Sequence, residues 1–164
     1  MEQKELAELF GKLGAPDPEV WARSQLEEGI PQLARFLFLR QAWRQIVNEG
    51  DSSWIDSSIE RAEKNPIKPY AGVGLALKKL RARGATDEEI VDVVRGMQAQ
   101  LLFSFCYLLW DPGELEPEVA DMNWALAQVN DDGEVLGGIG SLHESVLRTD
   151  PTGREMRPRS GNAG

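Results

Sequence analysis

A run of ten almost uninterrupted apolar residues, 101–110, constrains the fold more than any other feature of this sequence. The run reads LLFSFCYLLW, and its only clearly polar residue is Ser104. A helix that crosses a membrane needs about 20 such residues, so this run is about half of a membrane span. A shorter apolar run is typical of a helix in a protein core. We therefore expect a protein without a membrane span and with a buried core helix over residues 101–110.

Glycine and proline divide the chain before this run into helical segments. Each segment has apolar residues at helical spacing, begins near a capping residue or a proline, and ends before a glycine or a proline. The clearest start is Thr86, because the acidic residues 87–89 that follow suit the first turn of a helix. The sequence predicts helices over residues 2–13, 18–28, 31–48, 52–64, 70–83 and 86–110.

The pattern changes after Pro112. Two prolines and a glycine predict a loop over residues 111–120. Two short apolar runs then flank the Asn-Asp-Asp-Gly sequence of residues 130–133, which is typical of a β-hairpin. A last short helix is expected over residues 140–148. The sequence thus predicts a mainly α fold, with six or seven helices in an orthogonal or irregular bundle and a small C-terminal β-hairpin.

The length of 164 residues fits one domain. We expect residues 1–150 to form a single compact, mostly helical domain. Residues 151–164 have no apolar periodicity and are expected to form an extended tail, with about the last six residues disordered. The N-terminal residues have no signal-peptide pattern, which favours a soluble, cytoplasmic protein.

The formal net charge of −9 comes from one stretch of the chain. Residues 96–147 contain nine acidic residues and no lysine or arginine, whereas residues 1–95 have a net charge of −2 and residues 148–164 a net charge of +2. This charge argues against nucleic-acid binding. The segment could attract a basic partner, or its acids could be solvated loop and cap residues that keep the protein soluble.

The first functional hypothesis is a non-catalytic protein-binding domain, such as an inhibitor, an immunity protein or an accessory domain. Its partner would be a basic protein, and the acidic segment 111–144 would steer association. Tryptophan is common at the centre of interfaces, so two tryptophans join the candidates. The apolar helix 97–110 could also be covered by a second copy in a homo-oligomer. The candidate binding residues are Glu114, Glu116, Glu118, Asp121, Asp131, Asp132, Glu134, Trp110 and Trp124.

The alternative is a small enzyme. His143 would act with Glu144 or Asp150 as acid and base, and Arg40 or Arg154 would hold an anionic substrate. This hypothesis requires His143 and an arginine in the same cleft. The sequence contains no strong catalytic motif, so we favour the non-catalytic hypothesis.

Cofactor and metal sites are not expected. One histidine and one cysteine cannot form a His- or Cys-based metal cage within one chain. Gly72 and Gly74 resemble the start of a dinucleotide-binding loop, but the third glycine and a preceding strand are missing. Cys106 lies in the most apolar run and is interpreted as an unreactive core thiol.

Two arginines interrupt the apolar face of the predicted helix 31–48. Arg40 and Arg44 fall near the centre of its apolar arc on a helical wheel. A buried guanidinium needs a carboxylate or must extend to solvent. We expect structural ion pairs between these arginines and the acidic segment, and the alternative is an anion-binding site.

Overall fold

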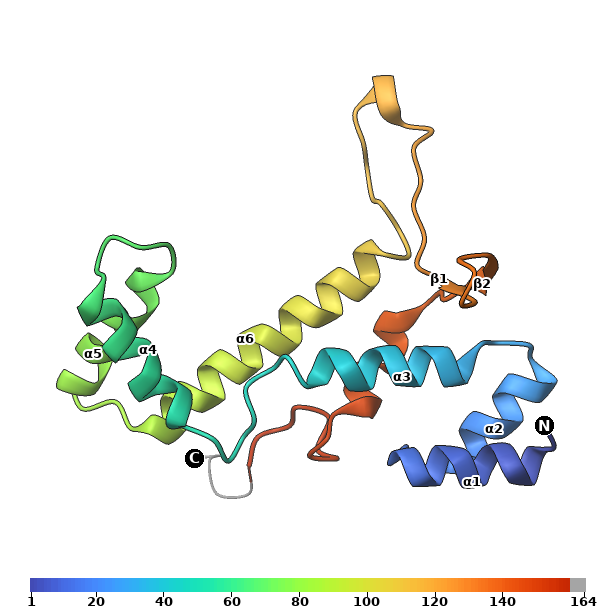
Figure 1. The fold of residues 1–164 in the computed structure, drawn as a ribbon, viewed down its shortest axis with the longest axis horizontal. Coiled ribbons are helices and arrows are strands. Elements are labelled where there is room, and N and C mark those ends of the chain that lie inside the picture. Colours follow the sequence, from blue (N-terminus) through green and yellow to red (C-terminus); the bar gives the residue numbers. More distant parts are fainter. Residues whose placement is uncertain (160–164) are drawn as a thin grey trace. The chain divides into compact units, whose positions relative to one another are not determined.

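The computed structural model describes residues 1–159, and in this part of the chain six α-helices precede a small antiparallel hairpin (Figure 1). The predicted mainly α fold with a C-terminal hairpin is confirmed, and the helices predicted before the hairpin are all present. We expected disorder in about the last six residues of the tail, and of these, residues 160–164 lie outside the described part of the chain. The helices are α1 (Gln3–Leu13), α2 (Pro18–Glu27), α3 (Gln32–Trp43), α4 (Ser53–Lys64), α5 (Ala71–Ala82) and α6 (Asp87–Leu108).

Two boundaries differ from the prediction. Helix α3 ends at Trp43, five residues before the expected end, and the chain turns away so that the Val47 N–H donates to Oε1 of Gln98 at 2.8 Å. The expected helix over residues 140–148 consists of two short 3-10 helices, η2 (Leu142–Ser145) and η3 (Leu147–Thr149). A third, η1 (Pro117–Val119), lies in the predicted loop.

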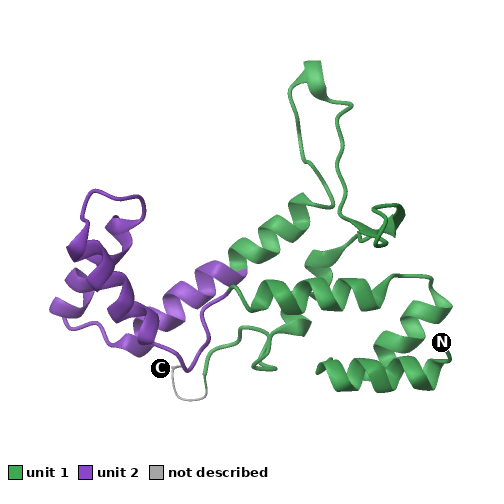
Figure 2. Cartoon of the chain, viewed as in Figure 1, with its two compact units in different colours: residues 1–45, 100–164 green, residues 46–99 purple. Residues whose placement is uncertain are grey.

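The chain forms two compact units, which Figure 2 shows in different colours. Unit 1 contains residues 1–45 and 100–164, and unit 2 contains residues 46–99. Helix α6 begins in unit 2 and ends in unit 1. The expected single domain over residues 1–150 stays a prediction.

The core of unit 1 begins with an aromatic cluster between α1, α2 and α3. The rings of Phe10, Trp21 and Phe36 are all buried, and their centroids lie 5.8–6.0 Å apart. Tilted and edge-to-face contacts at this separation suit the charge distribution of aromatic rings. The helical spacing of Leu6 and Phe10 places both side chains of α1 in this cluster.

Helix α3 also anchors the C-terminal part of unit 1. Its buried side includes Arg35 and Trp43, whose polar groups bind the short helices that follow the hairpin. The Trp43 Nε1–H donates to the carbonyl of Val146 at 3.1 Å and to the hydroxyl of Thr149 at 3.2 Å. Hydrogen bonds between groups so distant in sequence hold η2 and η3 on α3.

Unit 2 is built on close packing between α4 and α5. Gly74 of α5 is buried, and a Cβ atom there would overlap the carbonyl oxygen of Ser58 and lie 2.6 Å from the Cβ of Ala62. The pair of glycines that resembled a nucleotide-binding loop therefore includes a helix-packing residue. The core cluster of this unit contains Ile55, Leu77, Ile90 and Val91.

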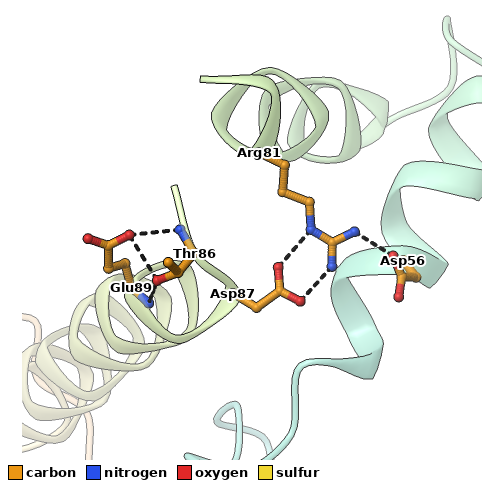
Figure 3. A network of polar contacts seen from close by, with 5 residues as sticks. All are labelled: Asp56, Arg81, Thr86, Asp87 and Glu89. Atoms are coloured by element: carbon orange, nitrogen blue, oxygen red, sulfur yellow. Dashed lines mark hydrogen bonds and ion pairs between the residues drawn. The ribbon is translucent and has the colours of Figure 1, made fainter. Parts of the chain in front are cut away.

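Polar contacts also connect α4 and α5 to the start of α6 in this unit (Figure 3). The Arg81 guanidinium donates to both carboxylate oxygens of Asp87, at 2.7 and 2.8 Å, and to Asp56 at 2.5 Å. Thr86 and Glu89 form a capping box at the predicted start of this helix: the Glu89 N–H donates to the Thr86 hydroxyl, and the Thr86 N–H donates to the Glu89 carboxylate at 2.7 Å. The Thr86 hydroxyl also donates to the Glu89 carboxylate, at 2.9 Å, and the two hydrogen bonds that this carboxylate accepts from Thr86 lower the pKa of Glu89.

Candidate protein-binding surface

The C-terminal half of α6 exposes most of the apolar run, contrary to the expectation of a buried core helix. At 100° per residue, the exposed apolar side chains of residues 101–108 cover an arc of about 200°. Only Gln100 and Ser104 interrupt this arc, and neither is charged. The exposed apolar side chains of this half are Leu101, Phe103, Phe105, Tyr107 and Leu108, and the exposed Trp110 follows directly after the helix.

Leu101, Phe105 and Leu108 form one continuous line on this arc, which we call the α6 stripe. Their spacing of four and three residues places them on one side of the helix. Leu101 and Phe105 each have 55% of their surface exposed, and Leu108 has 42%. A helix that is apolar on nearly all sides is normally buried, so the α6 stripe is a candidate binding surface.

The buried side of the C-terminal half of α6 contains Cys106, which has 1% of its surface exposed. Burial raises the pKa of this thiol from 9.0 to about 11, because the thiolate loses its hydration. This agrees with the sequence interpretation of an unreactive core thiol.

Slow alkylation of Cys106 is the expected consequence. The thiolate is the reactive form, so the native protein should react with iodoacetamide at pH 8 at least about 100-fold more slowly than the chain unfolded in guanidinium. The unfolded chain releases this proton from about pH 9, whereas the folded protein keeps it until about pH 11. The free energy of unfolding should therefore fall as the pH rises through this interval. Equal alkylation rates in the two states would contradict the assignment of Cys106 to the core.

An extended acidic segment follows α6. We call residues 111–126 the acidic arm; Figure 1 shows it leaving the end of α6 as a long loop and returning to the hairpin. Of residues 113–125, only Leu115 is half-buried and the others are exposed. The Trp124 Nε1–H donates to the carbonyl of Leu108 at 2.6 Å, which ties the returning part of the arm to the helix.

Four of the candidate acids lie on this arm. Glu114, Glu116, Glu118 and Asp121 are exposed, and none of them forms an ion pair within residues 1–159. Their charges are therefore not neutralised by neighbours in the described chain. Such a group of uncompensated carboxylates creates a local negative potential that reaches about a Debye length into solution.

The other three candidate acids lie on the hairpin. Strands β1 (Ala127–Val129) and β2 (Val135–Gly138) pair antiparallel, with an irregularity after Gln128. Asn130 organises the turn: its side-chain oxygen accepts from the N–H groups of Asp132 and Glu134 at 3.1 and 2.9 Å. Asp131, Asp132 and Glu134 are exposed, so the turn presents carboxylates to solvent.

The two candidate tryptophans flank the base of the arm. Trp110 is 56% exposed, and its ring packs so closely on Gly140 that a Cβ there would lie 2.5 Å from the ring. Trp124 is 41% exposed. Unit 1 thus brings together, on α6 and the residues after it, the candidate tryptophans and the acidic arm.

The structure does not assemble the residues of the enzyme hypothesis into an acid–base group. His143 packs edge-on against Tyr107 and Phe103, at centroid distances of 5.0 and 5.9 Å. Its Nδ1 is buried without a hydrogen-bond partner in the described chain. Glu144 instead lies 3.7 Å from Arg35 and has 63% of its side chain exposed.

Asp150 and Arg154 belong to the turn that follows η3. The Asp150 carboxylate accepts from the N–H and hydroxyl of Thr152 and from the N–H of Met156, at 2.7–3.1 Å. Arg154 donates to the carbonyl of Arg157. These contacts give Asp150, which is only 5% exposed, a role in holding the turn.

The arginine that binds the C-terminal segment is Arg35 and not Arg40 or Arg44. Arg40 donates to the carbonyl of Leu13 at 3.2 Å, and Arg44 donates to the side chain of Gln41 at 3.2 Å. No ion pair of either arginine is present in residues 1–159. The buried side of α3 runs through Gln32, Arg35, Phe36, Leu39 and Trp43, so its centre is displaced from the one that the helical wheel predicted.

In residues 1–159, no group of three or more histidine, cysteine, aspartate or glutamate side chains is arranged to hold a metal ion. Within the same residues, no helix has the length and hydropathy that crossing a membrane requires. Comparisons with protein-family models, with curated proteins and with solved structures found no match.

Proposed function

We propose that this protein is a protein-binding domain, with an inhibitory or accessory role, whose docking surface combines the α6 stripe with the acidic arm and the hairpin turn. The observation that supports the proposal is the exposure of a helix that is apolar on most of its circumference. Exposed apolar patches larger than a few hundred Å² are rare on monomers and usually mark binding sites.

The chemistry of the partner follows from the two parts of this surface. The α6 stripe offers anchors at the spacing that an amphipathic helix uses in helix–helix contacts. The arm and the hairpin turn follow these anchors in the chain, carry exposed carboxylates and contain no lysine or arginine. The complementary partner is therefore an apolar surface bordered by lysine or arginine, and opposite charges would accelerate the encounter.

A defined peptide tests this proposal. A fluorescent amphipathic helix of leucine and lysine should bind the protein, and the matched peptide of leucine and glutamate should not. Replacing Glu114 and Glu116 with Gln, and Asp131 and Asp132 with Asn, should weaken binding of the leucine–lysine peptide at least about tenfold in 50 mM salt. Fluorescence anisotropy measures the Kd, and raising the salt concentration should weaken binding by the wild type.

A matched variant separates a local surface from the net charge. Glu8, Glu27, Glu28 and Glu60 are exposed acids outside the proposed surface, and their replacement with Gln removes the same number of charges. For the apolar part, Leu101→Ser should weaken binding, whereas Leu26→Ser should not, because Leu26 is equally exposed (49%) on α2. Equal effects of each variant and its control would contradict the proposed surface.

A further inference from the structure

A basic counterpart of the acidic arm lies on unit 2 of the same chain. Residues 61–83 contain seven lysine and arginine residues and a single acid, Glu63. Two of these bases are already engaged, since Lys78 binds Glu63 and Arg81 binds Asp56 and Asp87. Lys64 and Lys68 are exposed and form no ion pair in the described chain.

These two lysines border a pocket of about 530 Å³ between α4, the loop after it and the start of α5. We call it the basic pocket. Arg61 adds a third positive charge, and Tyr70, 90% exposed, adds an apolar ring. The first turn of α5 contains no acid, and Tyr70 gives it no side-chain cap. These features together favour the binding of an extended segment that carries carboxylates and apolar side chains.

The acidic arm has the composition that the basic pocket requires. It contains five acids, no base, and the exposed apolar side chains of Val119 and Met122. Its residues 113–125 are almost entirely exposed, so nearly all of them are available for contact. A single chain thus contains both an acidic segment and a basic site that match in charge.

The α6 stripe can pair with its own copy without electrostatic cost. Residues 97–110 contain no charged side chain, so two such helices can pack together without like-charge repulsion. Symmetric dimers use the same patch on both subunits, and a contact between two different regions then occurs twice. A dimer in which the two stripes pair would be symmetric, and a contact between the arm of one copy and the basic pocket of the other would then occur twice.

The α6 stripe supplies part of the area that such a dimer needs. The exposed fractions of Leu101, Phe105 and Leu108 correspond to on the order of 300 Å², at roughly 150–250 Å² for each large side chain, so the contacts between arm and pocket must bury the remainder. A stable interface of standard size buries about 800 Å² on each partner.

We propose that the partner of the docking surface is a second copy of this chain: the α6 stripes of two copies pack together, and the acidic arm of each copy binds the basic pocket of the other. This inference rests on the proposed function, because it identifies the partner of the same surface.

Charge reversal in two separate proteins tests the reciprocal contact. One protein carries Glu116→Lys and Glu118→Lys on the arm, and the other carries Lys64→Glu and Lys68→Glu at the pocket. Each protein alone would place like charges at both arm–pocket contacts, so its dimer Kd should rise at least about tenfold over the wild type. A mixture of the two restores opposite charges at both contacts, and a heterodimer should form with an affinity near that of the wild type.

Sedimentation equilibrium of the wild type, each variant and the equimolar mixture measures these affinities in 50 mM salt. Lys4→Glu with Lys12→Glu, two exposed lysines of α1, is the matched control and should leave the dimer unchanged. Circular dichroism of every variant checks that the helices are intact.

Three results would overturn the proposal. The first is a wild type that stays monomeric at 100 μM, roughly the upper range of such a measurement. The second is a mixture that stays monomeric although the wild type dimerises, as expected if the arm binds the pocket of its own chain. The third is a dimer that none of the variants weakens. In each case, binding of the leucine–lysine peptide to the α6 stripe would leave the proposed function intact, whereas its absence would overturn that function as well.

Discussion

Replacing Gly74 with alanine should destabilise unit 2 by about 1–3 kcal/mol, because the new methyl group has no space between α4 and α5. It would overlap the carbonyl oxygen of Ser58 and lie 2.6 Å from the Cβ of Ala62. Both are parts of a packed helix, so the two helices must separate to accept it. Urea unfolding followed by circular dichroism should show a lower midpoint for Gly74→Ala than for the wild type.

The neighbouring Gly72 provides the control for this substitution. It lies in the first turn of the same helix, and a Cβ there meets no atom within 4 Å. Gly72→Ala should leave stability unchanged or raise it by up to about 1 kcal/mol, since alanine has the higher helix propensity. If both substitutions had the same effect on stability, the close approach of α4 would not be the reason why residue 74 is a glycine.

Replacing Arg35 with methionine should destabilise the attachment of η2 and η3 to α3 by about 2–4 kcal/mol. Arg35 is 4% exposed, and its guanidinium donates to the carbonyl of Ser141 at 2.6 Å and to the hydroxyl of Ser145 at 3.1 Å. Burial lowers the pKa of this guanidinium, and the nearby Glu144 opposes that shift. Methionine fills similar space but leaves both acceptors without their donor, and hydrogen bonds to charged groups contribute about 1.5–3 kcal/mol each.

Glu144 shows whether the ion pair or the hydrogen bonds hold this segment. Its carboxylate lies 3.7 Å from Arg35 and is mostly exposed, and such pairs contribute at most about 1 kcal/mol. Glu144→Gln should therefore have a small effect on the thermal unfolding midpoint, and Arg35→Met a large one. Equal effects would assign the anchoring role to the ion pair.

The helices could be predicted because their signals are local. Caps such as Thr86, and glycines or prolines at the ends, act within a few residues, so a single sequence contains the information. The early end of α3 could not be found in this way, since the amide of Val47 binds Gln98, which is 51 residues away.

The candidate surface was predicted in part. The acids of the arm and the two tryptophans were identified from charge and composition, and the structure places them around the end of α6. The exposure of Leu101 and Phe105 was missed, because an apolar run looks the same whether its own chain or a second protein covers it. A helix apolar on most sides, followed by a segment too polar to cover it, was the available signal.

The arginine that anchors the C-terminal segment was also missed. Helix α3 has apolar residues on more than half of its circumference, so the wheel did not define which side faces inward. The packing of η2 and η3 selects the side that contains Arg35. The basic pocket escaped notice for a similar reason, since its residues come from α4, α5 and the loop between them.

The uncharged end of α6 and the carboxylates that follow it have a joint consequence for colloidal behaviour. Exposed apolar segments promote aggregation, and charged residues at their ends act as gatekeepers against it. Here nine carboxylates and no base lie within residues 96–147, so acidic surfaces of other proteins are repelled from the apolar helix at long range. A surface with positive charges of its own can approach more closely, and we therefore expect the same carboxylates both to limit aggregation and to select the partner of the proposed surface.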